Sequence, residues 1–141
     1  MIISLIACTK KKKNYKCPAC ELYSESTLFK YAYEYSKIYS DKIFILSAKY
    51  GLIDESEIIE PYDLTLNNQN EVFKKNWSER VFKQIQSKFN LDNLEIVFLA
   101  GENYRKYLIP LIQNYKNTKI SIPLKNLGIG KQMQFLKNNI K

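Results

Sequence analysis

The sequence predicts one α/β domain over residues 1–141, a three-layer α/β/α arrangement with a four-stranded parallel sheet between helices. Two observations predict this fold class. Four short apolar segments alternate with four longer segments of helical periodicity, and each connection is long enough for a crossover between parallel strands. The expected strands are residues 2–7, 43–47, 95–100 and 119–122, and the expected helices are residues 26–39, 70–89, 104–115 and 129–140.

The first expected strand is short, apolar and rich in β-branched residues, which is typical of a strand buried on both faces of a sheet. Ser26 can cap the first helix, and its apolar residues recur at helical spacing. That face carries Leu28, Ala32, Tyr35 and Tyr39. We therefore expect these tyrosines to pack against the domain and not to form a stacking platform.

The second helix has large apolar residues at four-residue steps, namely Phe73, Trp77, Val81, Ile85 and Phe89. Trp77 is therefore expected to anchor the core, and Asn90 fits the end of this helix. Pro110 is expected to bend the third helix. The last helix shows one apolar face, made of Ile129, Met133, Leu136 and Ile140.

The composition indicates a folded, basic protein. Apolar residues make up 45% of the chain, and 22 lysines and arginines against 14 acidic residues give a net charge of +8. Nucleic acid is the commonest anionic partner of a small basic domain. No stretch approaches the roughly 18 consecutive apolar residues of a membrane span. We therefore expect a cytoplasmic protein without a membrane partner.

The chain contains no histidine. This absence removes Ser-His and Cys-His nucleophile pairs and imidazole metal ligands, so any proton transfer falls to carboxylates, tyrosines, a lysine or a bound water. Cys17 and Cys20, in a loop expected over residues 14–25, have the spacing of a zinc or redox site, and Cys8 adds a third thiol. Because a fourth ligand is lacking, no metal site is predicted.

A polar segment follows the second expected strand. Ser47, Lys49 and Tyr50 come first, and Glu60, Tyr62 and Asp63 follow. Pro61 forces Glu60 toward an extended conformation, so the two carboxylates are not on one helix face. The carboxylates can order a water or face a developing positive charge, with the tyrosines stacked on a flat ring. Alternatively, Asp63 caps a turn and Glu60 pairs with Lys49.

In a parallel sheet the four strand exits, at Cys8, Ser47, Gly101 and Pro123, share one rim, where ligands of open α/β folds bind. The lysine run 10–13 begins at this rim, either as a solvated loop or as a phosphate site. Gly128 and Gly130 resemble part of a phosphate cradle but lack the remaining glycine of a dinucleotide fingerprint. No cofactor is therefore predicted.

Several blocks of the chain, in order, resemble an uncharacterised family of small bacterial, archaeal and phage proteins. The blocks are Cys8-Thr9-Lys10, Glu21-Leu22-Tyr23, residues 47–52, Glu60-Pro61-Tyr62-Asp63, Trp77, residues 99–104 and residues 123–130. The layout is also similar, more distantly, to the uracil-DNA-glycosylase-like superfamily, including the glycosylase-like domain of archaeosine synthase. Two departures are the missing histidine after the fourth strand and Cys20 where the small family more usually has arginine.

The superfamily resemblance implies a sheet of strand order 2-1-3-4 and a nucleobase- or nucleotide-directed protein that cleaves N-glycosidic bonds. It implies that Asp63 or Glu60 orients a water, that Tyr62 and Tyr50 stack on a base, and that Lys49 and Lys10 hold phosphate. The implied ligand contacts also include Cys8, Thr9, Tyr23, Ser47, Gly101, Tyr104, Leu124, Gly128 and Gly130. A non-catalytic nucleic-acid-binding domain and a small nucleotide-binding or processing protein remain alternatives.

Overall fold

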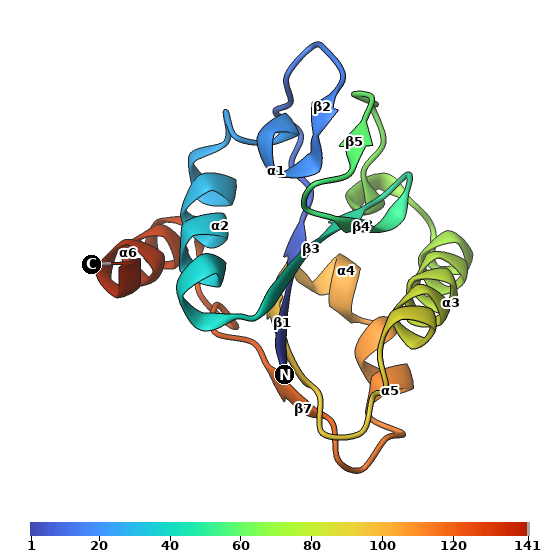
Figure 1. Cartoon of the computed structure of the whole chain (residues 1–141). Coiled ribbons are helices and arrows are strands. Elements are labelled where there is room, and N and C mark those ends of the chain that lie inside the picture. The colour runs from blue at the N-terminus through green and yellow to red at the C-terminus, as the bar shows by residue number, and fades with distance from the viewer. Residues whose placement is uncertain (141) are drawn as a thin grey trace.

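The computed structural model describes residues 1–140 and has a five-stranded sheet at its centre (Figure 1). Four strands are parallel: β1 (Ile2–Ala7), β3 (Lys42–Ser47), β6 (Glu95–Leu99) and β7 (Lys119–Ser121). The fifth, β4 (Gly51–Asp54), pairs antiparallel with β3 at one edge. The order is β4-β3-β1-β6-β7, so the parallel strands have the expected order 2-1-3-4.

The antiparallel strand β4 corrects the prediction of a four-stranded, wholly parallel sheet. The side chain of Ser47 accepts hydrogen bonds from the backbone N–H groups of Lys49 and Tyr50, at 3.2 and 3.0 Å, which closes a tight turn directly after β3. Gly51 then takes a positive φ of 76°, and the chain returns along β3. The segment expected to be only a polar break thus begins with a hairpin.

Replacing Gly51 by alanine is expected to lower the free energy of unfolding by about 1–3 kcal/mol, because a side chain at positive φ is strained. The new Cβ would also overlap Oε1 of Gln84, which accepts a 2.8 Å hydrogen bond from the N–H of Leu52. Urea unfolding measures the effect. Gly128→Ala is the matched control, since its Cβ meets nothing within 4 Å, and an equal loss in both variants would contradict this reason.

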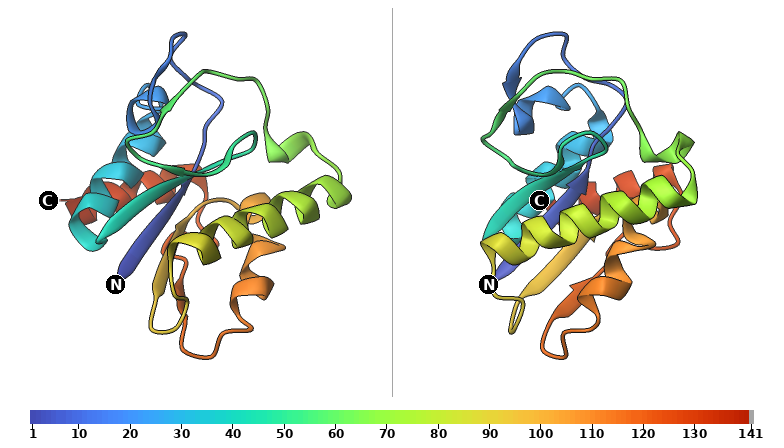
Figure 2. Two further views of the ribbon diagram at one scale, coloured as in Figure 1. Left: turned by 45° about the vertical axis from the view of Figure 1, so that its right-hand side comes forward. Right: turned by 90° about the vertical axis from the view of Figure 1, so that its right-hand side faces the viewer.

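Helices cover both faces of the sheet (Figures 1 and 2). On one face lie α2 (Thr27–Tyr39) and α6 (Ile129–Ile140), which contact each other. On the other face lie α3 (Glu71–Lys88), α4 (Glu102–Arg105) and α5 (Leu108–Ile112). The expected cap is confirmed at Ser26, whose hydroxyl accepts from Phe29 N, and Asn70 caps α3 in the same way.

Details of the helices differ from the prediction. The third helix is two short helices that separate at Lys106, because Pro110 has no N–H for the carbonyl four residues earlier and its ring collides with that carbonyl. Trp77 is buried in the core as expected, but Phe73 is 36% exposed and lines a surface hollow. Ile129 is 68% exposed, and Leu136 is the buried residue of α6.

A small two-stranded unit lies above the carboxyl ends of β1 and β3 (Figure 1). Its strands are β2 (Cys17–Pro18) and β5 (Ile58–Ile59), and α1 (Ala19–Leu22) follows β2. Residues 14–25 were expected to be only a loop. They contain β2 and α1, which the sequence did not reveal because both elements are too short to produce a periodic pattern. The pairing of β2 with β5 holds the lysine run after β1 beside the segment that leads to Asp63. The 3-10 helix η1 (Leu66–Asn68) follows Asp63 in the chain.

Candidate functional site

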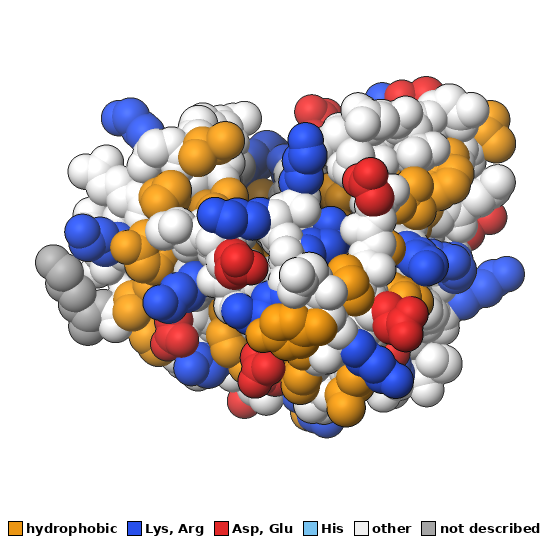
Figure 3. All heavy atoms as spheres, turned by 90° about the horizontal axis from the view of Figure 1, so that it is seen from above, with side chains coloured by type: hydrophobic (Ala, Val, Ile, Leu, Met, Phe, Trp, Pro, Cys, Tyr) orange, Lys and Arg blue, Asp and Glu red, His pale blue; other side chains and the backbone are white. Residues whose placement is uncertain are grey.

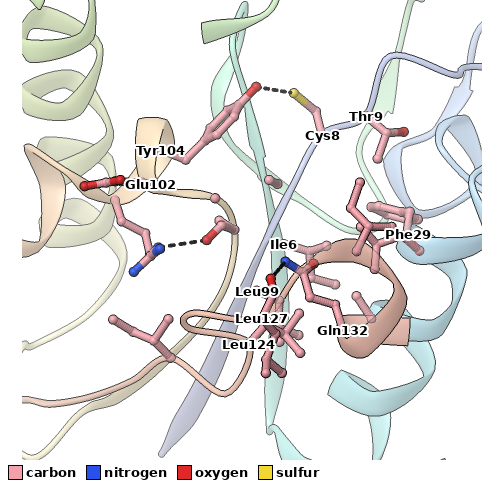
Figure 4. A pocket seen from close by; sticks show the side chains of 18 of the residues that line it. Ile6, Cys8, Thr9, Phe29, Leu99, Glu102, Tyr104, Leu124, Leu127 and Gln132 are labelled. Atoms are coloured by element: carbon pink, nitrogen blue, oxygen red, sulfur yellow. Dashed lines mark hydrogen bonds between the residues drawn. The ribbon is translucent and has the colours of Figure 1, made fainter. Parts of the chain in front are cut away.

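A cavity of about 430 Å³ opens at the carboxyl ends of the parallel strands, between α4 on one side and α2 and α6 on the other. Its polar wall includes Cys8, Thr9, Glu102, Tyr104 and Arg105, and its apolar wall includes Phe29, Leu124 and Leu127. Figure 4 shows Cys8 and Tyr104 facing each other, with Sγ and Oη 3.3 Å apart. This cavity is where the topology predicted that strand exits meet.

A second cavity, of about 660 Å³, adjoins the first and shares with it Cys8, Thr9, Asn67 and Tyr104. The residues of its own wall include Lys10, Lys12, Asp63, Thr65 and Asn68. We call the two cavities together the cleft. Seen from above, in Figure 3, several lysine and arginine side chains lie in and beside the hollow at this end of the molecule, with a few acidic side chains near them. The cleft therefore suits a ligand with both apolar and anionic parts.

A buried cluster of hydroxyl groups supports the cleft from behind. The hydroxyl of Ser47 donates to Tyr62 Oη at 2.7 Å, and Tyr62 Oη lies 2.6 Å from Tyr23 Oη. The indole Nε1 of Trp77 donates to the carbonyl oxygen of Ser47 at 2.8 Å. These bonds satisfy the buried hydroxyls and fix the end of β3, so Ser47 and Tyr23 act as supports and do not line the cleft.

Two neighbouring side chains contact the Tyr62 ring. The amine of Lys12 lies 4.7 Å from its centroid, and the ring of Tyr50 meets it edge-on at 5.5 Å. A nucleobase would have to displace Lys12 before it could stack on Tyr62. The prediction that Tyr62 and Tyr50 stack on a base therefore requires a rearrangement of this corner.

Stability is expected to fall above about pH 10, because burial raises the pKa values of the Tyr23, Tyr62 and Tyr104 hydroxyls above their ordinary range. In that range the unfolded chain loses tyrosine protons that the folded chain keeps. Each such tyrosine then lowers the free energy of unfolding by about 1.4 kcal/mol per pH unit. Urea midpoints at pH 8 and pH 11 measure this loss.

The matched variants for the alkaline loss are Tyr62→Phe and Tyr15→Phe. Tyr62→Phe removes one buried hydroxyl and should reduce the pH dependence, whereas Tyr15 is 55% exposed and its variant should follow the wild type. Equal pH dependence in all three proteins would show that tyrosine ionisation does not cause the alkaline loss.

Lys12 lines the cleft but was not predicted as a site residue, although Lys10 of the same lysine run was. Its side chain is half-buried, and burial lowers the pKa of its amine, while Cys8 and Asp63 oppose that shift. No local pattern distinguishes it from the three other lysines of the run. Asn67 and Arg105 also line the cleft and were not predicted, whereas Glu102 follows Gly101 at an expected strand exit and could have been inferred from that position.

The predicted site residues fall into three groups. Those that line the cleft are Cys8, Thr9, Lys10, Asp63, Gly101, Tyr104 and Leu124. Those in or against the supporting cluster are Tyr23, Ser47, Tyr50 and Tyr62. Those that lie elsewhere are Lys49, Glu60, Gly128 and Gly130; they are exposed, and Lys49 lines a separate hollow of about 370 Å³ against α3.

The alternative ion pair between Glu60 and Lys49 is wrong, because no salt bridge joins these side chains within residues 1–140. Of the two predicted carboxylates, Asp63 lines the cleft and Glu60 does not. Across the same residues, no three histidine, cysteine, aspartate or glutamate side chains meet in a group that could hold a metal ion. The described chain also has no helix long and apolar enough to cross a membrane.

Comparisons with known proteins agree with the resemblance to an uncharacterised family. The chain is similar to "Uncharacterized protein YfjM" of Bacillus subtilis (strain 168), with 29% identity over 109 residues. The match covers 76% of this chain and 70% of the relative. A family described as "Family of unknown function (DUF6884)" matches residues 3–138. This match spans the sheet, both helix layers and the cleft, and the chain belongs to that family.

Proposed function

We propose that the cleft binds a nucleotide or a nucleotide unit of a nucleic acid and hydrolyses its N-glycosidic bond. The observation that carries this proposal is that Lys12 and Asp63, an amine and a carboxylate, line one hollow that adjoins a cavity with one apolar and one polar wall. A nucleotide has this same division into an anionic phosphate, a sugar and a flat, largely apolar base.

The base fits the first cavity best. Its volume of about 430 Å³ lies within the usual range for small-molecule sites, and Phe29, Leu124 and Leu127 give it apolar walls. Glu102 and Arg105 supply an acceptor and a donor for polar groups on the base edge. Arg105 is held by a 2.9 Å hydrogen bond from its Nε to the carbonyl of Ala100, which leaves its terminal nitrogens for a ligand.

The phosphate fits the second cavity, where Lys10 and Lys12 carry the positive charge. Lys49 was expected to share this role, but it lines the separate hollow against α3. Because Lys12 is half-buried, its attraction for an anion is screened less by salt than that of a fully exposed lysine. Lys12 therefore takes the role that the resemblance gave to Lys49.

The proposed reaction adds water to the anomeric carbon and breaks its bond to the base nitrogen. The base leaves with the bonding electron pair, and the state between has the character of an oxocarbenium cation. The carboxylate of Asp63 stabilises that cation and accepts a proton from the attacking water. Glu60, the other carboxylate considered, lies on the surface outside the cleft.

The fold adds support of a limited kind. The order β3-β1-β6-β7 of the parallel strands is the 2-1-3-4 order of the uracil-DNA-glycosylase-like superfamily. A shared strand order does not determine a function, and β4 adds an antiparallel edge to this sheet. The chemistry of Lys12 and Asp63 in the cleft therefore carries more weight in this proposal than the topology does.

A second candidate function is nucleic-acid binding without catalysis. It is favoured by the lysine run 10–13 at the mouth of the cleft together with the net charge of +8. On this reading the cleft holds one unit of a strand and Asp63 contacts it without bond cleavage.

The test combines binding with base release. Binding of nucleoside monophosphates and of short single- and double-stranded DNA and RNA is measured by calorimetry between 50 and 200 mM salt. Chromatography of the same mixtures detects free base. Salt-dependent binding with base release supports the hydrolase, and binding without release supports the second candidate. Absence of binding to every one of these ligands at low salt would refute both.

A further inference from the structure

Lys74 is the only charged side chain among residues 1–140 that is buried, with 7% of the residue exposed. It lies in α3, and its Nζ donates a 3.0 Å hydrogen bond to Oδ1 of Asn103 in α4. Its Nζ also lies 3.6 Å from Oε1 of Glu71, which is an exposed residue. Since burying a lysine costs free energy unless its charge has partners, its position behind the cleft calls for an explanation.

The contact with Lys74 fixes the orientation of two amides. A lysine ammonium only donates hydrogen bonds, so Asn103 must turn its oxygen toward Lys74 and its nitrogen away from it. Asn103 Nδ2 in turn donates to Oδ1 of Asn67 at 2.8 Å. The oxygen of Asn67 is therefore engaged by Asn103, and the outward group of Asn67 is its N–H donor. The direction of this chain follows from the chemistry of lysine alone.

Asn67 stands where the two cavities of the cleft meet, because it lines both of them. It belongs to η1, and the hydroxyl of Thr65 accepts a 3.2 Å hydrogen bond from its backbone N–H. Within residues 1–140, no group accepts a hydrogen bond from its side-chain nitrogen. An exposed residue that lines both the proposed base and the proposed phosphate subsites thus has its oxygen engaged by Asn103 and its N–H donor free for a ligand.

We propose that Asn67 is a specificity-determining residue that donates a hydrogen bond to an oxygen acceptor of the ligand, either a base carbonyl or a phosphate oxygen. Lys74 and Asn103 are positioning residues that act through Asn67. This inference rests on the proposed function for the class of ligand. Without Lys74 the two amides can flip together, and Asn67 can present its oxygen as readily as its nitrogen.

The test is a change of preference between ligands. Inosine and adenosine monophosphates differ by a carbonyl in place of an amine, and so do uridine and cytidine monophosphates. Each pair is also compared as the nucleosides without phosphate. Asn67→Asp keeps the shape of the side chain but offers only acceptors, and Asn67→Leu removes hydrogen bonding without adding charge. Asn76→Asp, on the exposed surface of α3, controls for the added charge.

If Asn67 reads a base carbonyl, the wild type binds the carbonyl member of a pair at least about tenfold more tightly, and Asn67→Asp reverses that preference. If Asn67 contacts phosphate, Asn67→Asp weakens all monophosphates about equally and leaves the nucleosides unchanged. Asn67→Leu loses the affinity in either case. The inference would be overturned if Asn67→Asp bound these ligands with the affinities of Asn76→Asp and if Asn67→Leu bound them with the affinities of the wild type.

Lys74→Met tests the positioning role, with Lys75→Met as its control, because Lys75 is the exposed lysine next in the chain. Lys74→Met is expected to bring the ratio of affinities for the carbonyl and amine ligands toward one, or to weaken all monophosphates if phosphate is the partner. Lys75→Met should keep the wild-type pattern. A purely structural role for Lys74 predicts a change in urea midpoint with no change in ligand preference, and that outcome would overturn the positioning role.

The direction of the amide chain can also be read without any ligand. In nitrogen-15 spectra of the free protein, the side-chain amide protons of Asn103 should be protected from exchange and those of Asn67 should not. Protection of Asn67 instead would show that the chain runs the other way and would overturn the inference. If the spectra show the expected direction of the amide chain but no nucleotide or nucleoside binds the wild type, the proposed function is wrong. The assignment of a nucleotide as the ligand of Asn67 is then wrong as well.

Discussion

Replacing Trp77 by alanine is expected to lower the free energy of unfolding by about 3–5 kcal/mol, the usual cost of truncating a large buried aromatic side chain. The indole is only 3% exposed and meets Tyr104 edge-on, with ring centroids 5.5 Å apart. The substitution also removes the donor for the carbonyl of Ser47, which holds the end of β3. Urea unfolding followed by circular dichroism is the measurement, because Trp77 is the single tryptophan.

Phe73→Ala is the matched control for Trp77→Ala. Phe73 lies one turn earlier on α3 and is 36% exposed, so its truncation should cost less than about 1.5 kcal/mol. If both variants lost the same stability, the anchoring role of the indole would be wrong. The pair therefore separates burial of a side chain from any change in helix propensity.

Replacing Asp63 by asparagine is expected to lower the rate of base release by at least about 100-fold, the usual contribution of a positioned general base. Asparagine keeps the shape of the side chain but neither accepts a proton nor opposes a positive charge. Affinity for the intact ligand should remain within a few-fold of the wild type, because we propose that Lys10 and Lys12, which line the second cavity, hold the phosphate. Single-turnover kinetics with a labelled base measures the rate, and calorimetry measures the affinity.

Glu60→Gln is the control for Asp63→Asn. It removes the same charge three positions earlier. Both carboxylates are exposed, but Glu60 lies outside the cleft, whereas Asp63 lines it. Base release should stay near the wild-type rate in this variant. A large loss in Glu60→Gln with none in Asp63→Asn would show that the wrong carboxylate had been assigned.

Much of the fold could be predicted from the sequence, because the spacing of apolar residues shows which face of each helix is buried and where the buried strands lie. Ser26 is a clear helix start. The order of the parallel strands could be expected only from the superfamily resemblance, and alternation alone does not determine it. The hairpin at Gly51 was missed because its signal is the hydroxyl of Ser47 bonding to its own turn, which no periodicity reveals. The break before Pro110 was expected as a bend, and its position follows from the missing N–H.

The site could be predicted only as far as topology determines it. Residues within three positions of a strand end, such as Cys8, Gly101 and Leu124, reach the cleft as expected. Side chains in irregular segments could not be placed in this way. Asp63 and Glu60 are three positions apart, and tertiary packing alone decides which of them lines the cleft. The Lys74 contact that orients Asn67 joins residues distant in the sequence and leaves no local pattern.

The hairpin of β3 and β4 also bears on the order in which the chain folds. Ile45 pairs with Ile53 within one short turn, whereas every parallel pairing, such as Ile3 with Ile96, must first close a long loop. We therefore expect the hairpin to form early on the folding pathway and the parallel strands to join it later. Chevron analysis should give Ile53→Ala a higher φ-value than Ile96→Ala, and the reverse ranking would exclude this order.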